Sequence, residues 1–350
     1  MRLMKLEELT GEEKLARSIM TDDYKELLSQ GSTIKLEYIP KLRDIGITEV
    51  YVQDKIADPE ALAILKEDVN KNCKEKVQSI ISKHTYKHSN DMIEIGKTAD
   101  NIITNIMEEE EVIEQIFDIK ERSADLYEHS ISTCTLATLI ALRMNLSKEM
   151  VHDISVGCLL HELGLRYLVI NIDNINLEEM SDRDLAEYKK HPLYGYEAVK
   201  SVEWMTKVSK EILLCHHEKI DGSGYPLHAT EISLPTKIAS VCDFFDEHIC
   251  GIGCKRMKVY EVVEILKNSK GDSFDVEVVD TLLDFIAVYP SGSSVVTNEG
   301  EHAIVIKQNK GFPERPILQI ISDKDGNPYK EVVIKDLLEY NSVFIDNVLN

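Results

Sequence analysis

The sequence lacks long apolar runs and has little glycine or proline. Glycine occupies 16 and proline 9 of the 350 positions, which excludes collagen-like and low-complexity chains. No apolar stretch approaches the ~18 residues that cross a bilayer, so we expect no membrane insertion. The segment from Met1 to Glu8 has no apolar core of a secretory signal, and a cytoplasmic location is predicted.

Positive charge is also scarce. The chain has 40 basic and 62 acidic residues, a formal charge of -22. Such a chain repels nucleic-acid polymers and anionic membranes, so an anionic substrate must be held by local cations. The seven cysteines include no C-x-x-C pair, and no disulfide is expected. Cys250 and Cys254 could share a helix face, but without an evident third ligand they are interpreted as packing thiols.

The hydrophobic pattern predicts a mainly α protein. Residues 1–57 are expected to form a small N-terminal α/β domain, with a strand within 45–52. A helical connector, opening at Asp58 and Pro59, is predicted over 58–95. Apolar residues then recur every three or four positions over 96–288, which predicts a bundle of six to eight helices, one of them capped by Ser147. Residues 289–350 alternate like strands and predict a small C-terminal β-rich unit.

Histidines in the bundle lie beside acidic residues. His129 follows Asp125 by four positions, so one helix face could present both to an ion, although a solvated or capping pair is the alternative. His161 and Glu162 end an apolar stretch, where burying both groups without a partner is costly. A metal ion would compensate them. The alternative is a helix end with Glu162 exposed.

A second set of histidines lies near turns. His191 precedes Pro192 at a predicted helix start, where a structural role is the alternative. His216 and His217 end an apolar helix and are followed by a glycine-rich turn. The bare backbone of such a turn can approach a phosphate or sugar. The residues of this turn that we single out are Asp221, Gly222, Gly224, Tyr225 and Pro226.

From about residue 125 to 255 the chain resembles the HD-GYP phosphodiesterases, bacterial enzymes that hydrolyse cyclic di-GMP. His161-Glu162 stands where the family has His-Asp, and Gly224-Tyr225-Pro226 is intact. The histidines and Asp243 follow in the family's order. The resemblance implies an HD-domain helical bundle, and the N-terminal and C-terminal units look like those that flank such bundles.

The resemblance implies two or three divalent transition-metal ions, commonly iron or manganese. A metal-bridging hydroxide would hydrolyse cyclic di-GMP, or a related cyclic dinucleotide, to pGpG or GMP, with His161 and Glu162 in the catalytic role. The alternative is a degenerate receptor that binds cyclic di-GMP without turnover. Homodimer formation is left open. The implied metal ligands are Asp125, His129, His161, Glu162, His191, His216, His217 and Asp243, and the implied substrate-binding residues are Asp221, Gly222, Gly224, Tyr225, Pro226 and Lys255.

Three positions depart from the family pattern. Glu162 is one methylene longer than the usual aspartate, which would change the metal spacing. The usual lysine is Leu165, and an expected arginine is Ile252. Lys255 still matches a family contact to guanine or phosphate. Loss of a phosphate-facing donor can cost on the order of 10² in rate.

Overall fold

The fold is described from a computed structural model, over residues 2–15, 19–20, 26–29, 31–44, 47, 49–52, 64–83, 93–107, 117, 119, 124–172 and 176–349. The chain divides into two compact units. One comprises Leu62–Tyr289 with Lys310–Glu314, and the other comprises Met1–Ala61, Pro290–Asn309 and Arg315–Asn350.

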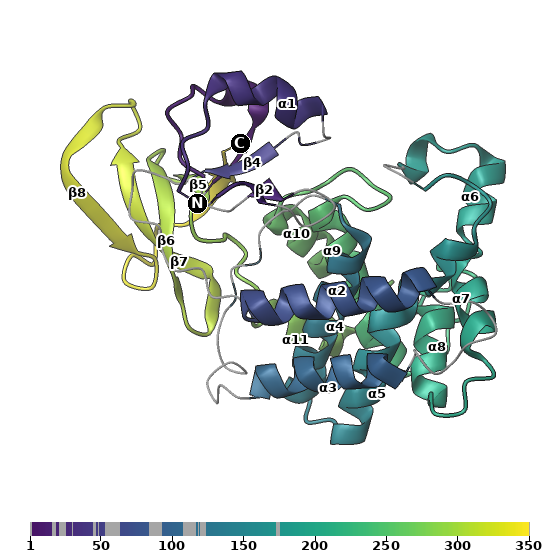
Figure 1. Cartoon of the computed structure of the whole chain (residues 1–350). Helices are drawn as coiled ribbons and strands as arrows, with labels where there is room; N and C mark the ends of the chain where they lie inside the picture. Colours follow the sequence, from purple (N-terminus) through teal and green to yellow (C-terminus); the bar gives the residue numbers. More distant parts are fainter. Residues whose placement is uncertain are drawn as a thin grey trace. The chain divides into compact units, whose positions relative to one another are not determined.

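The first unit is helical (Figure 1). Its elements are α2 (Glu67–Lys83), α3 (Ile93–Met107), α4 (Leu126–Arg143), α5 (Lys148–Leu160), the 3-10 segments η5 (His161–Tyr167) and η6 (Leu177–Glu179), α6 (Asp182–Tyr188), α7 (His191–Val199), α8 (Lys207–Cys215), α9 (Leu234–Cys250), α10 (Val259–Ser269) and α11 (Val276–Leu283).

Local sequence signals set several helix starts. Ser147 accepts a hydrogen bond from the backbone N–H of Met150, which confirms the predicted cap of α5. Thr206 caps α8 in the same way, and Pro192 occupies the first turn of α7. α2 begins at Glu67, and the predicted start at residues 58–59 lies outside the described residues.

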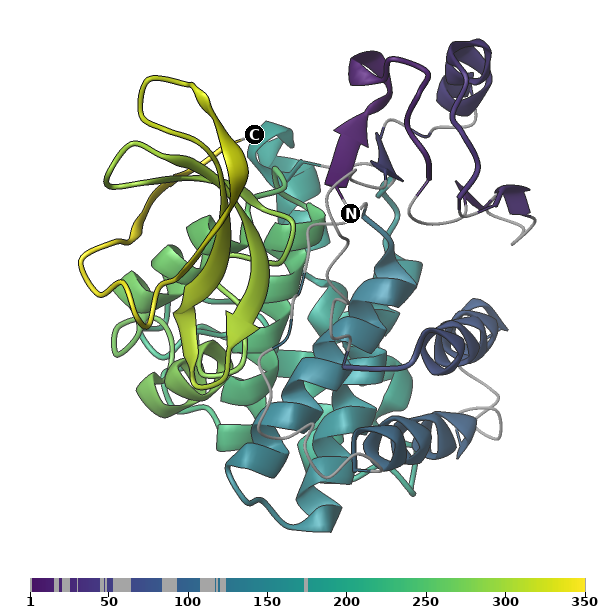
Figure 2. The same cartoon turned by 90° about the vertical axis from the view of Figure 1, so that its left-hand side faces the viewer.

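The helices share one apolar core. α4 packs against both α5 and α9, and α5 also packs against α8. α2 and α3 lie side by side along one face of this unit, as Figures 1 and 2 both show. Buried aliphatic residues such as Leu139, Leu159 and Ile238 fill the space between these helices. Among the described residues, no helix combines the length and apolar character that a membrane span requires.

The second unit contains the N-terminal segment. Its elements are β1 (Arg2–Lys5), η1 (Leu6–Glu8), β2 (Ile19–Met20), β3 (Glu26–Leu28), η2 (Leu36–Tyr38), α1 (Ile39–Asp44) and β4 (Glu49–Val52). β1 pairs antiparallel with β4, and β2 pairs with β3. The strand expected within 45–52 is β4, which follows α1; residues 45, 46 and 48 lie outside the described residues.

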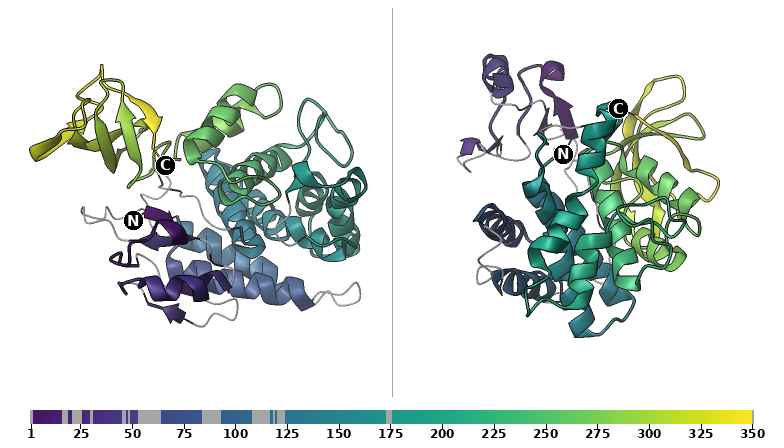
Figure 3. Two further views of the ribbon diagram at one scale, coloured as in Figure 1. Left: turned by 90° about the horizontal axis from the view of Figure 1, so that it is seen from above. Right: turned by 90° about the vertical axis from the view of Figure 1, so that its right-hand side faces the viewer.

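Most of a five-stranded antiparallel sheet, formed after Pro290, belongs to the same unit. Its strands are β5 (Ser294–Thr297), β6 (His302–Asn309), β7 (Phe312–Ser322), β8 (Pro328–Asp336) and β9 (Ile345–Val348), in the order β8-β7-β6-β5-β9. Figure 3 shows this sheet from two further sides. Buried and less buried residues alternate along these strands, and the side chains of Val295, Val305 and Leu318 are among the buried ones. The predicted mainly α fold with a small C-terminal β unit is therefore confirmed.

Candidate metal centre

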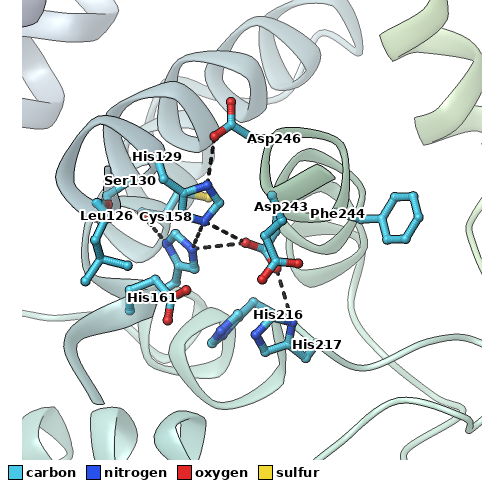
Figure 4. A network of polar contacts seen from close by, with 12 residues as sticks. Leu126, His129, Ser130, Cys158, His161, His216, His217, Asp243, Phe244 and Asp246 are labelled. Carbon is cyan, nitrogen blue, oxygen red and sulfur yellow. Dashed lines mark hydrogen bonds and ion pairs between the residues drawn. The ribbon is translucent and has the colours of Figure 1, made fainter. Parts of the chain in front are cut away.

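His129 projects from α4 toward α9 and lies between two carboxylates. Its Nδ1 is 2.8 Å from Oδ2 of Asp246, and its Nε2 is 3.1 Å from Oδ1 of Asp243. The two aspartates are three residues apart on α9, so they share the helix face that packs against α4. Figure 4 shows the ring between them, and Phe244 pointing the other way.

His161 is the first residue after α5 and completes a group with His129. Its Nδ1 donates to the backbone carbonyl of Cys158 over 2.6 Å. Its Nε2 lies 3.1 Å from both the Nε2 of His129 and Oδ1 of Asp243. All three residues are at most 1% exposed. We call His129, His161 and Asp243 the first subsite.

His191, His216 and His217 form a second group, which we call the second subsite. The Nε2 atoms of His191 and His216 are 3.2 Å apart, and the candidate ligand atoms of the three rings all lie within 4.8 Å of one another. His191 comes from the start of α7, and the other two follow α8 directly. Oε2 of Glu162 lies 3.2 Å from Nε2 of His191.

Close backbone packing brings these segments together. Gly164 lies so near to α7 that a Cβ atom at this position would stand 1.7 Å from the carbonyl oxygen of His191. Only glycine permits this approach. The glycine therefore allows η5 to deliver His161 and Glu162 beside the second subsite.

The hydrogen bonds fix which ring nitrogens face inward. Nδ1 of His191 contacts the carbonyl of Tyr188, and Nδ1 of His216 contacts those of Ile212 and Leu213. Carbonyl oxygens only accept, so Nδ1 carries the proton. The Nε2 lone pairs then converge on the interior.

This donor set fits divalent metal ions. The Nε2 lone pairs of His191 and His216, which are 3.2 Å apart, repel unless a cation lies between them. Adjacent ligands of an octahedral ion with bonds of ~2.1 Å are about 3 Å apart. Imidazole nitrogen and carboxylate oxygen together suit the first-row transition metals. The side chains therefore lie at metal-ligand spacing.

Asp243 belongs to both halves of the centre. Its Oδ1 faces the first subsite, and its Oδ2 lies 3.2 Å from Nδ1 of His217. Burial alone would raise the pKa of Asp243, but the facing rings of His217 and His129 hold it well below its usual value. The carboxylate is therefore charged and can bridge two cations.

The histidines of the two subsites differ in basicity. Burial opposes a charge on His129, but its hydrogen bonds to Asp243 and Asp246 raise its pKa well above the usual value. Burial lowers the pKa of His191 and His216, and it lowers the pKa of His217 to about 3. The second subsite therefore presents neutral imidazoles, the form that binds metals.

The glycine-tyrosine-proline turn covers the second subsite. The ring of Tyr225 stacks on that of His217, with the centroids 4.6 Å apart. A Cβ atom at Gly224 would meet the carbonyl of His217 at 2.4 Å, so this position also requires glycine. The buried carboxylate of Glu218 accepts the backbone N–H groups of Leu227 and Ala229 and holds the turn in place.

The remaining predicted site residues are Asp125, Asp221, Gly222, Pro226 and Lys255. Asp125 is the N-cap of α4: its Oδ1 accepts two backbone N–H groups, and its Oδ2 is 2.6 Å from Nζ of Lys74. It therefore lies outside the groups of potential ligands found among the described residues. The carboxylate of Asp221 is bonded to Ser223 and Ser273, and its pKa is lowered to about 2 by these bonds. Gly222 has a positive φ of 77° in the same turn, Pro226 follows a cis peptide bond, and Lys255 is exposed.

Sequence reasoning missed three acidic residues. Asp246 holds His129, Glu218 holds the turn, and Glu247 lies within 4.8 Å of Glu162 and His217. Burial and the carboxylates of Asp243 and Glu162 raise the pKa of Glu247 well above its usual value. Spacing from Asp243 could have found two of them, because positions three and four residues further along a helix lie on the same face. The alternative of an exposed Glu162 is wrong, because the residue is 2% exposed.

Comparison with known families matches residues 111–278 to the HD domain family. This chain contains an HD domain. Residues 294–350 match a KOW domain associated with the HD domain, which covers the five-stranded sheet. The resemblance to HD-GYP proteins drawn from the motifs is confirmed.

Two curated relatives carry names that describe their activity. The chain is 24% identical over 225 residues to the cyclic di-GMP phosphodiesterase PA4108 of Pseudomonas aeruginosa, covering 63% of this chain and 52% of that protein. It is 32% identical over 154 residues to the cyclic di-GMP phosphodiesterase response regulator RpfG of Xanthomonas campestris, covering 42% and 40%. The chain thus spans about half the length of the curated relatives it matches or less.

A solved structure shares the fold. Bd1817 of Bdellovibrio bacteriovorus, described as a HDG"Y"P protein, superposes with a TM-score of 0.54 at 17% identity. The match covers 80% of this chain and 97% of that one. At this identity the likeness supports the HD-domain fold.

Proposed function

We propose that this chain is a metal-dependent phosphodiesterase that hydrolyses cyclic di-GMP, or a related cyclic dinucleotide, to pGpG or GMP. We also propose that the centre holds two or three divalent ions, iron or manganese. The observation that carries the proposal is the position of Asp243, whose two oxygens face different subsites. One carboxylate shared between two histidine groups is an arrangement suited to a two-metal site.

Bound ions would supply the chemistry at phosphorus, by lowering the pKa of a water and by stabilising the entering and leaving oxygens. The protein residues prepare this centre. Asp243 fixes the spacing of the subsites, and Asp246 orients the His129 ring. Burial of His161 and Glu162 keeps bulk water away from the two proposed catalytic residues.

The surroundings of Tyr225 support binding of an anionic nucleotide. Nζ of Lys189 lies 5.4 Å from the centroid of the Tyr225 ring, which itself stacks on His217. Lys189 is exposed, as is Lys255. Lys189 thus offers a cation beside the Tyr225 ring, whereas Leu165, which is 5% exposed, has no charge to offer. An aromatic face beside a cation suits a base and its phosphate.

The test uses the purified full chain loaded with Mn²⁺ or Fe²⁺ and incubated with cyclic di-GMP. Chromatography should show pGpG or GMP, and no product should form after the ions are removed with a chelator. His216→Ala should bind less metal and form no product. The control is His152→Ala, which alters a histidine of α5 that lies near Asp100 and Asp153, and this variant should retain both metal and activity. Tight binding of cyclic di-GMP without any product would support the receptor alternative instead.

A further inference from the structure

One face of the C-terminal sheet is aliphatic but does not form part of its core. Val305 on β6 and both Leu318 and Ile320 on β7 are buried, so the residues that alternate with them point to the opposite face. Ile320 pairs with Val333 of β8, which places the two neighbours of Val333 on that opposite face as well. We call it the open face, and its residues on these three adjacent strands are Ile304, Ile306, Ile317, Gln319, Ile321, Val332 and Ile334.

The open face carries no charged side chain at these seven positions. Charged residues make up 29% of the chain, so seven positions would ordinarily include about two of them. Two of the side chains on this face, Val332 and Ile334, are 71% and 54% exposed, and the other five are half-buried. An uncharged surface of adjacent aliphatic groups, partly open to solvent, is typical of a contact with another molecule.

The two most exposed residues lie on an edge strand. In the order of the sheet β8 has β7 on one side, and no other described strand pairs with its second side (Figure 1). Backbone N–H and C=O groups along that side can therefore extend the sheet by one strand. Pro328 limits pairing only where the strand begins. An added strand would therefore pair with the backbone around Val332 and Ile334 and cover both side chains.

We propose that β8 pairs antiparallel with β8 of a second copy of this chain, which joins two five-stranded sheets across a two-fold axis. Centring the axis on Val333 places Val332 of each copy opposite Ile334 of the other. The same register sets Glu331 opposite Lys335, so no like charges face each other. Every pair in this register joins positions on the same face, and the two open faces become one continuous aliphatic surface.

The charge of the chain points to a second copy as the occupant of this edge. With a formal charge of -22, two copies repel each other over most of their surfaces, so they can meet only where acidic side chains are absent. A strongly charged partner would gain nothing from a surface without charge. The ladder joins at most the nine residues of β8 in each copy, which is a small interface. We therefore expect a reversible dimer with a Kd of about 10 µM.

The test is sedimentation equilibrium of the purified full chain over about 1 to about 200 µM, a range in which such a Kd shifts monomer to dimer. Val332→Lys and Ile334→Lys each place a charge on the shared edge and should raise the Kd at least about 10-fold. Val169→Lys is the matched control, because Val169 belongs to the helical unit and is 87% exposed. This variant should leave the Kd unchanged.

Hydrogen exchange read by mass spectrometry separates strand pairing from contact between two open faces. In the proposed dimer the backbone N–H groups within 331–335 that point away from β7 gain partners. The peptide containing them should therefore exchange more slowly at about 200 µM than at about 1 µM, and Val332→Lys should abolish this difference. Contact between open faces alone would leave the exchange of these groups independent of concentration.

Three results would overturn the proposal. The first is a wild-type chain that stays monomeric over the whole range, as it would if a segment of the same chain covered β8. The others are a dimer whose Kd is unchanged in both lysine variants, or a dimer in which exchange at 331–335 does not depend on concentration. Circular dichroism verifies the fold of each variant, and if one lysine variant does not fold, the other and the exchange of the wild-type chain decide the question. Neither measurement depends on metal or turnover, so this inference is tested separately from the proposed function.

Discussion

The histidines of both subsites are buried, but different groups contact them in the two subsites. In the first, Asp243 and Asp246 flank His129 and raise its pKa. In the second, backbone carbonyls fix the rings of His191 and His216, and burial keeps both neutral. A proton can therefore substitute for a metal in the first subsite. The second subsite has uncompensated lone pairs until a cation arrives.

Replacement of Asp243 should weaken metal binding in both subsites at once. Asp243→Asn loses the charge that both subsites share, so we expect the bound metal to fall in both and hydrolysis to drop by at least about 10²-fold. Elemental analysis and product chromatography measure the two effects. Asp280→Asn, which alters an exposed ion pair with Lys270, is the control. Full metal content in Asp243→Asn would contradict the shared role.

A change at Gly164 should affect the second subsite more. Gly164→Ala places a methyl group against the carbonyl of His191, so we expect the free energy of unfolding to fall by about 1–3 kcal/mol. Metal binding at the second subsite should weaken as α7 is displaced. Chemical denaturation and metal analysis measure both. Gly96→Ala is the matched control, because its Cβ would meet its nearest neighbour at an ordinary 3.7 Å; equal losses in both variants would refute the close-packing argument.

A change at Asp246 should affect the first subsite alone. Asp246→Asn weakens the hydrogen bond that orients His129, and loss of such a partner lowers metal affinity by about 10-fold to 100-fold. Competition with a coloured chelator should resolve one weakened ion beside others that are unaffected. Asp153→Asn, at an aspartate on α5 near His152, provides the baseline. Uniform weakening of all ions would show that the subsites are not independent.

The pH dependence of metal binding should differ between the two subsites. The raised pKa of His129 means that the metal-free first subsite carries a proton, which metal binding must displace. Its affinity should therefore increase with pH. The pKa of His217 is lowered to about 3, and those of His191 and His216 are also lowered, so binding there releases no proton. Mn²⁺ titrations from about pH 6 to about pH 8 should show one pH-dependent and one pH-independent class; two parallel dependences would contradict this.

The motifs predicted much of this centre because its histidines occur in recognisable strings. His161 and Glu162 directly follow an apolar helix, and His216 and His217 directly follow another, so burial and partnership could be inferred locally. Asp125 shows the limit of helical spacing. It lies at the cap position, where its side chain bonds to backbone N–H groups.

Contacts between distant segments could not be read from the sequence. The pairing of Asp125 with Lys74 joins two helices, and Glu218 meets Leu227 and Ala229 through a turn. Glu247 carries no motif and is recognised only when α9 is placed against the other helices. Such residues depend on packing, which local propensity does not specify.

The long separation of His129 from Asp243, which are 114 positions apart, has a consequence for biogenesis. A nascent chain that has emerged past His217 but not yet as far as α9 holds the five histidines of the two subsites but lacks the carboxylate between them. Tight capture of ions must therefore await synthesis of α9 and its docking against α4. Ions that bind only the folded chain would then stabilise it against unfolding.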